Sequence, residues 1–476
     1  HHLQKTQLGV YIEGAVSPWS RASRMLVSNH VKKQSSMPPG ARIQAAGELL
    51  ETVWQGTQPP GVLITEYFRK RRYAGSSDRR TIQEHLYAVL RHRARLDWWT
   101  ERTRLDLETG VRTRLLAHLT LVERMRPDAV SNLFSGARHC PHALSDLELE
   151  LADALYGRPL NHADMPVSTA YEFPAWMTDT LSALWGDRLG EEAAALNQTA
   201  SVDLRVNMLK TNREDAKRAL ADAFIKTEET AFSPLGLRVN GHPRLGSTEA
   251  FKRGLVEIQD EGSQLIALLV GAQPGMNAVD FCAGAGGKTL ALAATMGRDG
   301  KFAGRLTACD ISKTRLDRLR PRLRRAGAYA VKCRVIAAKD DNWVAEQTGR
   351  VDRVLVDVPC TGTGTWRRDP NAKWRITPTD LDDLIVQQRR ILRDAAGMVR
   401  TSGRLIYATC SLLQEENERQ MAWFIENHPD FQPLDIDQAW SESIGGTSPV
   451  GEPNLRLSPA MAATDGFFCA ILVKIT

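Results

Sequence analysis

Apolar residues in the first third of the chain recur at helical spacing. Between residues 41 and 121 they follow one another at intervals of three and four positions, which favours amphipathic helices. Pro59-Pro60-Gly61 interrupts this pattern, as expected at a helix boundary. We predict an all-helical module with a basic face, followed by further helices over residues 146–156 and 174–185.

The hydrophobic period changes from helical to alternating near residue 201. Val202, Leu204 and Val206 alternate with polar neighbours, which is typical of a half-buried strand. A helical run over residues 213–224 follows, and then short strand candidates up to Ile258. These elements predict a small α/β module of the RRM-like type.

After residue 262 a strand, a turn and a helix alternate repeatedly. The predicted strands cover residues 278–281, 305–309, 331–336, 354–356, 405–408 and 467–473. Thr377 should cap a long helix that begins with Pro378, carries Asp380 three positions after the cap and runs to about Val399. This alternation predicts an α/β fold with a parallel, doubly wound, Rossmann-like sheet. Ligands of such sheets bind at the carboxyl ends of the strands, so functional residues should directly follow each strand.

A length of 476 residues exceeds what one hydrophobic core supports, so we expect about three domains. The chain begins with His1-His2, which suggests a tag remnant or an over-extended start, and Met37 could be the natural beginning. The pattern predicts the divisions 1–36 (an unstructured or tag-derived segment), 37–140 (helical domain), 141–200 (helical linker region), 201–258 (small α/β module) and 259–476 (large α/β domain).

The net charge of +6 is unevenly distributed. Basic residues crowd two segments, and both clusters suit contacts with phosphate, although a solvated helix face explains each equally well. The clusters are Arg69, Lys70, Arg71, Arg72, Arg79 and Arg80, and Arg315, Arg318, Arg320, Arg322, Arg324 and Arg325. The hydrophobic fraction of 42% and the charged fraction of 25% are those of an ordinary globular protein.

The seven cysteines are an odd number, and none lies in a Cys-x-x-Cys or Cys/His cluster with zinc-ligand spacing. We therefore expect neither a disulfide framework nor a metal, and a reducing, cytoplasmic compartment. The longest apolar run, residues 265–272, is too short to span a membrane, and no signal peptide is evident. We expect no membrane association.

A glycine-rich turn follows the first strand of the predicted sheet, from Asp280 to Thr289. A phosphate-binding P-loop would need glycine where Cys282 stands, and a dinucleotide fingerprint would need its third glycine where Thr289 stands. The turn therefore predicts either a nucleotide-like ligand of another kind or simply a tight strand-to-helix connection.

Acidic residues follow the next two strands. Asp310 ends the second strand, where a carboxylate can accept both ribose hydroxyls of an adenosine moiety; the alternative role is to cap the next helix together with Ser312. Asp340 and Asp341 follow the third strand. One of them could contact an adenine amino group, and we choose Asp340.

Two cysteines follow the fourth and fifth strands. Cys360 stands in Asp357-Val358-Pro359-Cys360, and Cys410 in Thr409-Cys410-Ser411. Neighbouring parallel strands would present both thiols at one edge of the sheet. Cysteine is often a small buried hydrophobe, but that does not explain why both follow a strand end.

These motifs resemble the Sun/Fmu-type RNA cytosine-5 methyltransferases, most closely the bacterial small-subunit ribosomal RNA methyltransferase B group. The resemblance covers roughly residue 201 to the C-terminus and is carried by Arg205-Val206-Asn207-Met208-Leu209-Lys210, Gln259-Asp260-Glu261-Gly262-Ser263-Gln264-Leu265, the glycine turn, Asp357-Val358-Pro359-Cys360, Thr409-Cys410-Ser411 and Thr464-Asp465-Gly466-Phe467-Phe468. DNA cytosine-5 methyltransferases use a single cysteine after a proline, so the cysteine pair is specific. The chain departs from the family in having Gly284-Ala285 where Ala-Pro is usual.

The resemblance implies S-adenosylmethionine as cofactor and methylation of cytosine at carbon 5. It implies that Cys410 attacks carbon 6, Asp357 holds or protonates N3, and Cys360 assists release. The implied cofactor-binding residues are Cys282, Ala283, Gly284, Ala285, Gly286, Gly287, Lys288, Asp310, Asp340 and Asp357. Just beyond Cys360, Arg367, Arg368, Lys373, Trp374 and Arg375 offer RNA contacts, unless this is a solvated loop with its two tryptophans packed inward. The helical module resembles the family's RNA-binding N-terminal extension.

Three alternatives stay open on the sequence alone. The chain could be a non-catalytic RNA-binding factor in ribosome assembly, a P-loop nucleotidase, or a methyltransferase that acts on transfer RNA rather than on ribosomal RNA. The residues favour a monomeric enzyme with RNA as its partner. The catalytic residues do not reveal which RNA is bound, because that choice lies in the accessory modules.

Overall fold

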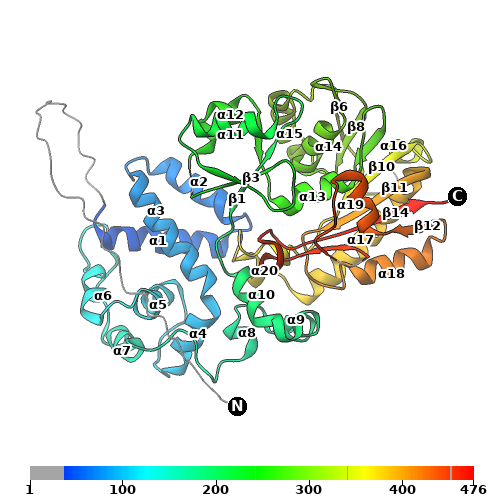
Figure 1. Ribbon diagram of the computed structural model, residues 1–476. Helices are drawn as coiled ribbons and strands as arrows, with labels where there is room; N and C mark the ends of the chain where they lie inside the picture. The colour runs from blue at the N-terminus through cyan, green and yellow to red at the C-terminus, as the bar shows by residue number, and fades with distance from the viewer. Residues whose placement is uncertain (1–36, 242, 340, 451–452) are drawn as a thin grey trace, which may run out of the picture. The chain divides into compact units, whose positions relative to one another are not determined.

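A computed structural model describes residues 37–241, 243–339, 341–450 and 453–476 (Figure 1). The predicted N-terminal segment, residues 1–36, lies outside the described residues. The predicted fold class is confirmed: a helical region, a small α/β module and a Rossmann-like domain follow one another along the chain.

The first helix of the described chain begins at Pro39, and the predicted interruption at Pro59-Pro60-Gly61 separates α1 from α2. Pro60 occupies the first turn of α2, and α3 begins directly after Gly75. The helices are α1 (Pro39–Gln55), α2 (Pro60–Lys70), α3 (Ser76–Arg91), α4 (Arg93–Arg102), α5 (Val111–Ala117), α6 (Pro127–Leu133), α7 (Asp146–Leu155), α8 (Val167–Ala170), α9 (Thr178–Trp185) and α10 (Leu189–Leu196). A π-helical turn, His118–Val122, extends α5.

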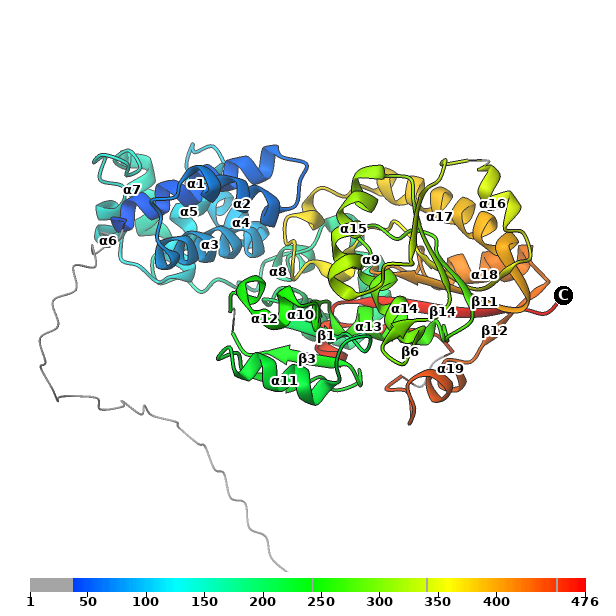
Figure 2. The ribbon, with the colours of Figure 1, turned by 90° about the horizontal axis from the view of Figure 1, so that it is seen from above.

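The small module is a four-stranded antiparallel sheet in the order β2-β3-β1-β4. Its elements are β1 (Val202–Val206), α11 (Arg213–Ala221), β2 (Thr227–Glu229), β3 (Gly236–Val239), α12 (Glu249–Lys252) and β4 (Val256–Ile258). Leu204 and Val206 of β1 pack with α11 and α12 on one face (Figure 2). Because side chains alternate along a strand, Asp203 and Arg205 point to the opposite face, toward the large domain.

The large sheet has the order β12-β14-β11-β10-β5-β8-β9, with β13 paired to β14. Its strands are β5 (Asn277–Asp280), β8 (Arg305–Asp310), β9 (Lys332–Val335), β10 (Val351–Asp357), β11 (Val399–Thr409), β12 (Phe431–Leu434), β13 (Leu455–Leu457) and β14 (Phe467–Lys474). A separate hairpin pairs β6 (Gly297–Arg298) with β7 (Lys301–Phe302). The five strands from β9 to β11 are parallel, and the strand order reverses between β5 and β10.

The prediction of a wholly parallel sheet is wrong at one edge. Strand β14 runs antiparallel to β11, and β12 and β13 both pair antiparallel with β14. No crossover helix precedes β14 in the described residues after β13, where only the short α20 (Pro459–Ala462) intervenes. The chain can therefore return beside β11 in the opposite direction.

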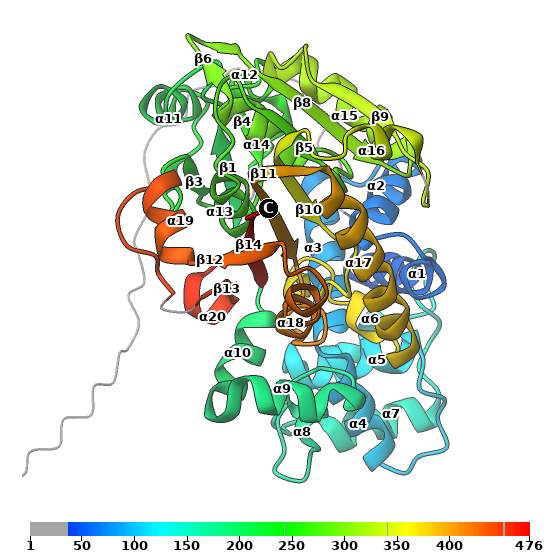
Figure 3. The same cartoon turned by 90° about the vertical axis from the view of Figure 1, so that its right-hand side faces the viewer.

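Helices cover both faces of the sheet (Figure 3). Long helix α17 (Pro378–Met398) and α18 (Glu418–Asn427) pack on one face, where their apolar side chains meet β10 and β11. α13 (Glu261–Leu269), α14 (Gly287–Thr295), α15 (Lys313–Ala326) and α19 (Ile436–Ser443) pack on the other. The predicted start of α17 is confirmed, because Thr377 and Asp380 form a capping box around Pro378. None of the described helices has the length and apolar character needed to cross a membrane.

Candidate active site

The turn between β5 and α14 requires glycine at two positions. Gly286 has a φ of 83°, and a Cβ there would lie 2.1 Å from Cδ1 of Leu319. Gly284 has a φ of 55°, but a Cβ there would meet no atom within 4 Å. Gly286 therefore allows helix packing, whereas Gly284 leaves the backbone open to space that a ligand can occupy.

Two arginines hold the backbone carbonyls of this turn. Arg205 of the small module donates from Nη1 to the Gly287 carbonyl over 2.9 Å, and Arg322 donates to the Ala285 carbonyl over 2.6 Å. The small module thus helps to shape the turn, which gives a physical role to the conspicuous Arg205 motif of the sequence.

Asp310 ends β8 with its side chain 4% exposed, and its carboxylate is bonded on both sides by backbone N–H groups. Its Oδ2 accepts the Gly284 N–H at 2.9 Å, and its Oδ1 accepts the Ser312 N–H at 2.7 Å. Ser312 is the N-cap of α15. Because Asp310 also borders the cavity described below, it can fix the turn and still accept ligand hydroxyls.

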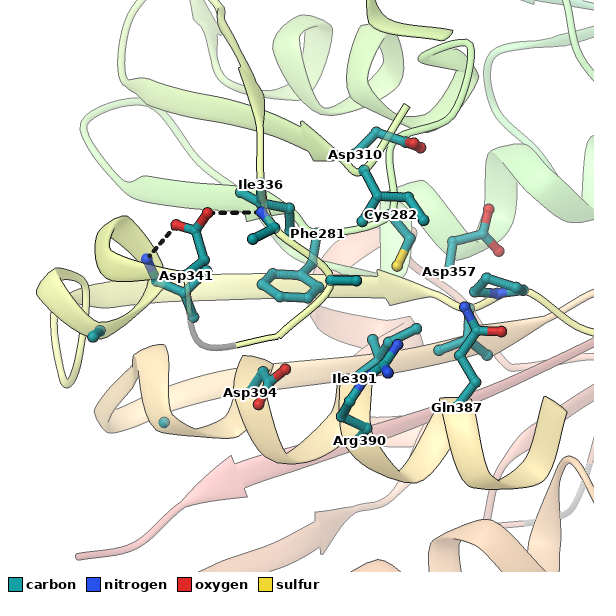
Figure 4. A pocket seen from close by; sticks show the side chains of 18 of the residues that line it. Phe281, Cys282, Asp310, Ile336, Asp341, Asp357, Gln387, Arg390, Ile391 and Asp394 are labelled. Carbon is teal, nitrogen blue, oxygen red and sulfur yellow. Dashed lines mark hydrogen bonds between the residues drawn. The ribbon is translucent and has the colours of Figure 1, made fainter. Parts of the chain in front are cut away.

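A cavity of about 720 Å³ opens at the carboxyl ends of the strands, beside the switch point between β5 and β10 (Figure 4). Of the predicted site residues, Cys282, Asp310, Asp357 and Cys360 border it. Ala283 to Lys288 do not line it; they form the turn beside it. Figure 4 shows Phe281 and Ile391 facing this space as well, so an apolar ring could pack against these two side chains in a cavity that acidic residues also line.

The third turn contributes Asp341 to this cavity. Asp340, the residue that we chose from the sequence, lies outside the described residues. Asp341 accepts the Ala337 N–H at 2.8 Å and the Trp343 N–H at 2.9 Å, so it is the N-cap of α16 (Asn342–Glu346). These bonds, the Ala337 one foremost, lower the pKa of Asp341 and outweigh the effect of its slight burial.

Three carboxylates and one ammonium group are concentrated beside the glycine turn. Lys288 donates from Nζ to Asp357 Oδ2 over 2.7 Å, although Lys288 belongs to α14 and Asp357 to β10. Burial alone would lower the pKa of Lys288, but the Asp357 carboxylate outweighs it and the pKa is raised. Asp280 is buried; its Oδ2 accepts the Thr289 hydroxyl at 2.6 Å, whereas its Oδ1 has no partner among the described residues. Burial raises the pKa of Asp280 to about 7.

The structure brings the two predicted cysteines together. Strands β10 and β11 are parallel neighbours, and beyond their ends the sulfurs of Cys360 and Cys410 lie 3.4 Å apart. Both residues are partly exposed. The hydrogen bond with Cys410, together with burial, raises the pKa of the Cys360 thiol well above its ordinary value. Cys360 borders the cavity together with Asp357, whereas Cys410 does not line it and reaches it only through its contact with Cys360.

The segment predicted to contact RNA is instead largely engaged within the protein. Lys373 is 1% exposed and donates to Asn197 Oδ1 over 2.8 Å, and burial lowers its pKa to about 8. Arg367 is 6% exposed and pairs with Asp465, which also pairs with Arg368. Sequence spacing could not show this, because the partners Asn197 and Asp465 are remote from this segment in the chain.

The remaining residues of that segment are also held by the protein. Trp374 is partly buried, and Arg93 lies 5.5 Å from its ring centroid. Arg375 pairs with Asp369 over 3.0 Å. The prediction of a free RNA-contacting loop is therefore wrong for Arg367 and Lys373, and the inward packing of the tryptophans holds for Trp366, which is 3% exposed.

A basic groove of about 1360 Å³ lies between α3 and the large domain. Its charged lining residues are Arg79, Arg80, Glu84, Arg91, Arg244, Arg367 and Arg368. Arg244 has no ion-pair or hydrogen-bond partner for its side chain within the described ranges, and Arg79 bonds only a backbone carbonyl. In the second basic cluster of the sequence, by contrast, Arg322 and Arg325 pair with Glu257.

One group of side chains in the helical region has ligand atoms close enough to hold a metal. His85 Nδ1 lies 3.2 Å from His118 Nε2, and Glu123 Oε1 lies 3.4 Å from the same His118 atom. Burial lowers the pKa of His118 to about 3, so the ring is neutral and a hydrogen bond between the two imidazoles explains the contact. The spacing of residues in the sequence gives no hint of this group.

Sequence reasoning missed several residues of the cavity. Gln387, Arg390 and Asp394 project from one face of α17, and their spacing of three and four positions was a signal that could have found them. Glu416, buried behind the two cysteines, was also missed, because only the folded chain shows which segments it joins.

Comparisons with known proteins agree with this architecture. The family model described as "16S rRNA methyltransferase RsmB/F" matches residues 267–473, and the model of the ferredoxin-like domain of RsmF/B-like methyltransferases matches residues 173–245.

Individual relatives extend the similarity over most of the chain. The chain is 33% identical over 325 residues to a protein of Synechocystis named probable ribosomal RNA small subunit methyltransferase B, covering 66% of this chain and 70% of the relative. It is 28% identical over 463 residues to ribosomal RNA small subunit methyltransferase B of Sodalis glossinidius, covering 91% and 98%. The solved structure of PH0851 superposes with a TM-score of 0.75 at 26% identity, covering 93% of this chain and 100% of that one.

Proposed function

The chain belongs to the RsmB/F family of 16S rRNA methyltransferases, and on that premise we propose that it methylates carbon 5 of a cytidine through a covalent adduct of Cys410. The observation that carries this proposal is the 3.4 Å separation of the Cys360 and Cys410 sulfurs beside Asp357. One thiol can add to a pyrimidine ring while the other acts on the same ring.

The cavity has the groups that S-adenosylmethionine requires. Asp310 can accept ribose hydroxyls, and Phe281 and Ile391 offer apolar contact for an adenine ring. Asp310 and Asp357 border the cavity and outnumber the single ammonium group of Lys288, which suits a ligand that carries positive charge. The same carboxylates would repel a triphosphate, which argues against a P-loop nucleotidase.

The residues divide the reaction between them. Carbon 5 of cytosine is a poor nucleophile until a thiolate adds to carbon 6, which is the role of Cys410. Asp357 holds or protonates N3, where negative charge develops during this attack. S-adenosylmethionine, when bound, supplies a methyl group on a positively charged sulfonium. Cys360, once its own proton has passed to solvent, accepts the proton from carbon 5. The electron pair of that C–H bond reforms the double bond between carbons 5 and 6, and Cys410 leaves carbon 6 as a thiolate.

The electrostatics of the thiol pair favour this division of roles. The hydrogen bond with Cys410 and burial raise the pKa of the Cys360 thiol. Its S–H can then stabilise a thiolate on Cys410, the attacking group. The target base must leave its stack to reach both sulfurs.

We propose small-subunit ribosomal RNA as the substrate, with transfer RNA as the alternative. The names of the Synechocystis and Sodalis relatives support ribosomal RNA. The groove lined by Arg79 and Arg244 offers cations that are not already paired with carboxylates, as phosphate binding requires. Bisulfite sequencing of RNA from cells with and without the gene should show the loss of one 5-methylcytidine from ribosomal RNA and none from transfer RNA.

The covalent step can be tested with two single substitutions. Cys360→Ala should trap a protein–RNA adduct that survives denaturation, whereas Cys410→Ala should form none and lose activity by on the order of 10³-fold or more. Cys333→Ala, a partly exposed cysteine on β9 outside the cavity, is the matched control and should behave as the wild type. An adduct with Cys410→Ala would reverse the two roles, and no adduct with either variant would refute covalent catalysis.

A further inference from the structure

A carboxylate without solvent exposure lies behind the two cysteine-bearing segments. Glu416 is 0% exposed and its carboxylate accepts four hydrogen bonds. Oε1 accepts the Thr361 N–H at 2.9 Å and the Gln388 amide at 3.0 Å. Oε2 accepts the Thr361 hydroxyl at 2.5 Å and the Ser411 hydroxyl. Thr361 directly follows Cys360 and Ser411 directly follows Cys410, so one side chain bonds both segments.

The chemistry of these four donors calls for a carboxylate. A buried carboxylate is costly unless hydrogen bonds or a cation compensate it, and no basic side chain pairs with Glu416 in the described part of the chain. Four donors converge on two oxygens, whereas a glutamine would present one oxygen and one further donor. Glutamate therefore suits this position, because its two oxygens accept the hydrogen bonds of all four donors.

Neighbouring side chains extend this anchor to the peptide units around the cysteines. Gln388 donates to the Pro359 carbonyl over 3.0 Å, immediately before Cys360. Asn417 donates to the Ser411 carbonyl over 2.9 Å and accepts the Thr409 hydroxyl at 2.6 Å, on both sides of Cys410. The Tyr407 hydroxyl donates to the Glu416 carbonyl over 2.6 Å and holds the anchor itself.

The sheet alone does not fix the distance between the sulfurs. The ladder between β10 and β11 ends at the pair Asp357 and Ala408, before either cysteine. Beyond that point, the Gly364 N–H donates to the Cys410 carbonyl over 2.9 Å, and Glu416 joins Thr361 to Ser411. The two segments are thus held together by the buried network, with Glu416 at its centre.

We propose that Glu416 is a positioning residue that sets the spacing of Cys360 and Cys410, and so makes the proposed two-thiol reaction possible. This inference rests on the proposed function for its meaning, but the spacing itself can be measured without RNA or cofactor. The negative charge of Glu416 also contributes to the raised pKa of Cys360, after the Cys410 bond and burial. Glu416 touches no substrate in this scheme and acts through the two loops.

A bifunctional thiol reagent such as dibromobimane tests the spacing directly. It joins two sulfurs only when both lie within its short reach, and peptide mapping identifies a link between Cys360 and Cys410. Glu416→Ala should slow this cross-linking by about tenfold or more, because the loops lose their shared anchor. Glu416→Gln should lie between Glu416→Ala and the wild type, since the Thr361 and Ser411 hydroxyls can turn to accept from an amide.

Glu261 provides a matched control for the loss of a buried glutamate. It is 0% exposed and accepts the N–H groups of Phe232 and Ser233 at 2.6 and 2.7 Å, away from the cysteines. Glu261→Ala should lower the Tm and leave the cross-linking rate unchanged. A folded Glu416→Ala that cross-links at the wild-type rate would overturn the proposal. If Glu416→Ala does not fold, an unchanged rate in Glu416→Gln overturns it instead.

A second readout separates positioning from stability alone. In Glu416→Gln the pH midpoint for alkylation of Cys360 should fall, because a negative charge beside that thiol is gone. Methylation assays should show a reduced kcat with an unchanged KM for S-adenosylmethionine. If the wild-type protein methylates no RNA while the cross-linking results hold, the proposed function fails and the positioning role of Glu416 stands.

Discussion

Thr361, Ser411 and Glu416, which follow β10 and β11, bond to one another with their buried polar groups, whereas the turns after β5 and β8 keep polar groups that the described chain does not fully bond. Thr361, Ser411 and Glu416 satisfy one another without solvent or ligand. On the other side, Gly284 faces open space and Asp280 has a buried oxygen with no partner in the described chain. Polar groups whose hydrogen bonds are all formed within the protein can position reactive atoms, while polar groups with unused hydrogen-bonding capacity are available to a ligand.

The largest expected effect concerns the turns after β5 and β8, which we call the open side. Asp310→Ala should weaken binding of S-adenosylhomocysteine by about 100-fold, because two charge-assisted bonds to ribose hydroxyls are lost. Titration calorimetry measures this affinity. Asp341→Ala is the matched control, because Asp341 lines the same cavity and, like Asp310, accepts two backbone N–H groups. Both variants lose such backbone bonds, so a much smaller loss of affinity in Asp341→Ala would leave the ribose contact as the difference. Equal losses would mean that the affinity falls through the backbone bonds and not through ribose.

A second prediction concerns the contact between the two sides. Lys288 belongs to the turn side, and its ammonium group pairs with Asp357 beside the cysteines. Lys288→Met should reduce the single-turnover rate by about tenfold, because Asp357 loses the partner that orients it. The exposed pair of Lys313 with Asp317 is the control, since Lys313→Met removes an ion pair of the same 2.7 Å length on the surface. A wild-type rate in Lys288→Met would show that the two sides work independently.

The sequence could predict the turns after β5, β8, β10 and β11 because their signals are local. Glycine, aspartate and cysteine stand directly after short apolar runs, and parallel neighbours must meet at one edge of the sheet. The meeting of Cys360 with Cys410 followed from this rule alone. Antiparallel β12 and β13 escaped, because they are short and β12 contains Pro433, a residue that weakens a strand signal.

Burial and remote partners could not be predicted. Lys373 and Arg367 look like solvated cations in the sequence, yet Asn197 and Asp465 bind them from distant segments. Glu416 stands among four other acidic or amide residues, Gln414, Glu415, Asn417 and Glu418, and nothing in that run indicates that Glu416 and Asn417 turn inward. A tertiary contact decides each of these cases, so the hydrophobic pattern carries no information about them.

A third prediction applies the same distinction to the arginines of the groove. Substitution of Arg79 and Arg244 together with glutamine should lower the slope of log affinity against log salt by about 2, because two phosphate contacts are lost. Filter binding with ribosomal RNA at several salt concentrations measures the slope. Arg368→Gln is the control, since Arg368 lines the same groove but already pairs with Asp260 and Asp465. Arg368→Gln should lower the Tm with little change in slope. If Arg368→Gln lowered the slope and the double substitution did not, RNA binding would be assigned to the paired arginines.

The smallest expected effect is a pH dependence that arises on the open side. Burial raises the pKa of Asp280 from 3.8 to about 7. Within that window the folded protein holds a proton that the unfolded chain has released, so this residue's contribution to stability is full below the window and is lost as the pH rises through about 7. Asp280→Asn cannot ionise and lacks this loss. Its Tm relative to the wild type should therefore increase by a few degrees as the pH is raised across the window, and scanning calorimetry measures the difference.

Thr289→Val removes the hydroxyl bond to Asp280 that favours the ionised form, so it should move the midpoint of the wild-type pH dependence upward. A difference in Tm between Asp280→Asn and the wild type that does not change with pH would mean that the unpartnered oxygen of Asp280 already has a hydrogen-bond partner. The polar groups of the open side would then be bonded as completely as those around the cysteines.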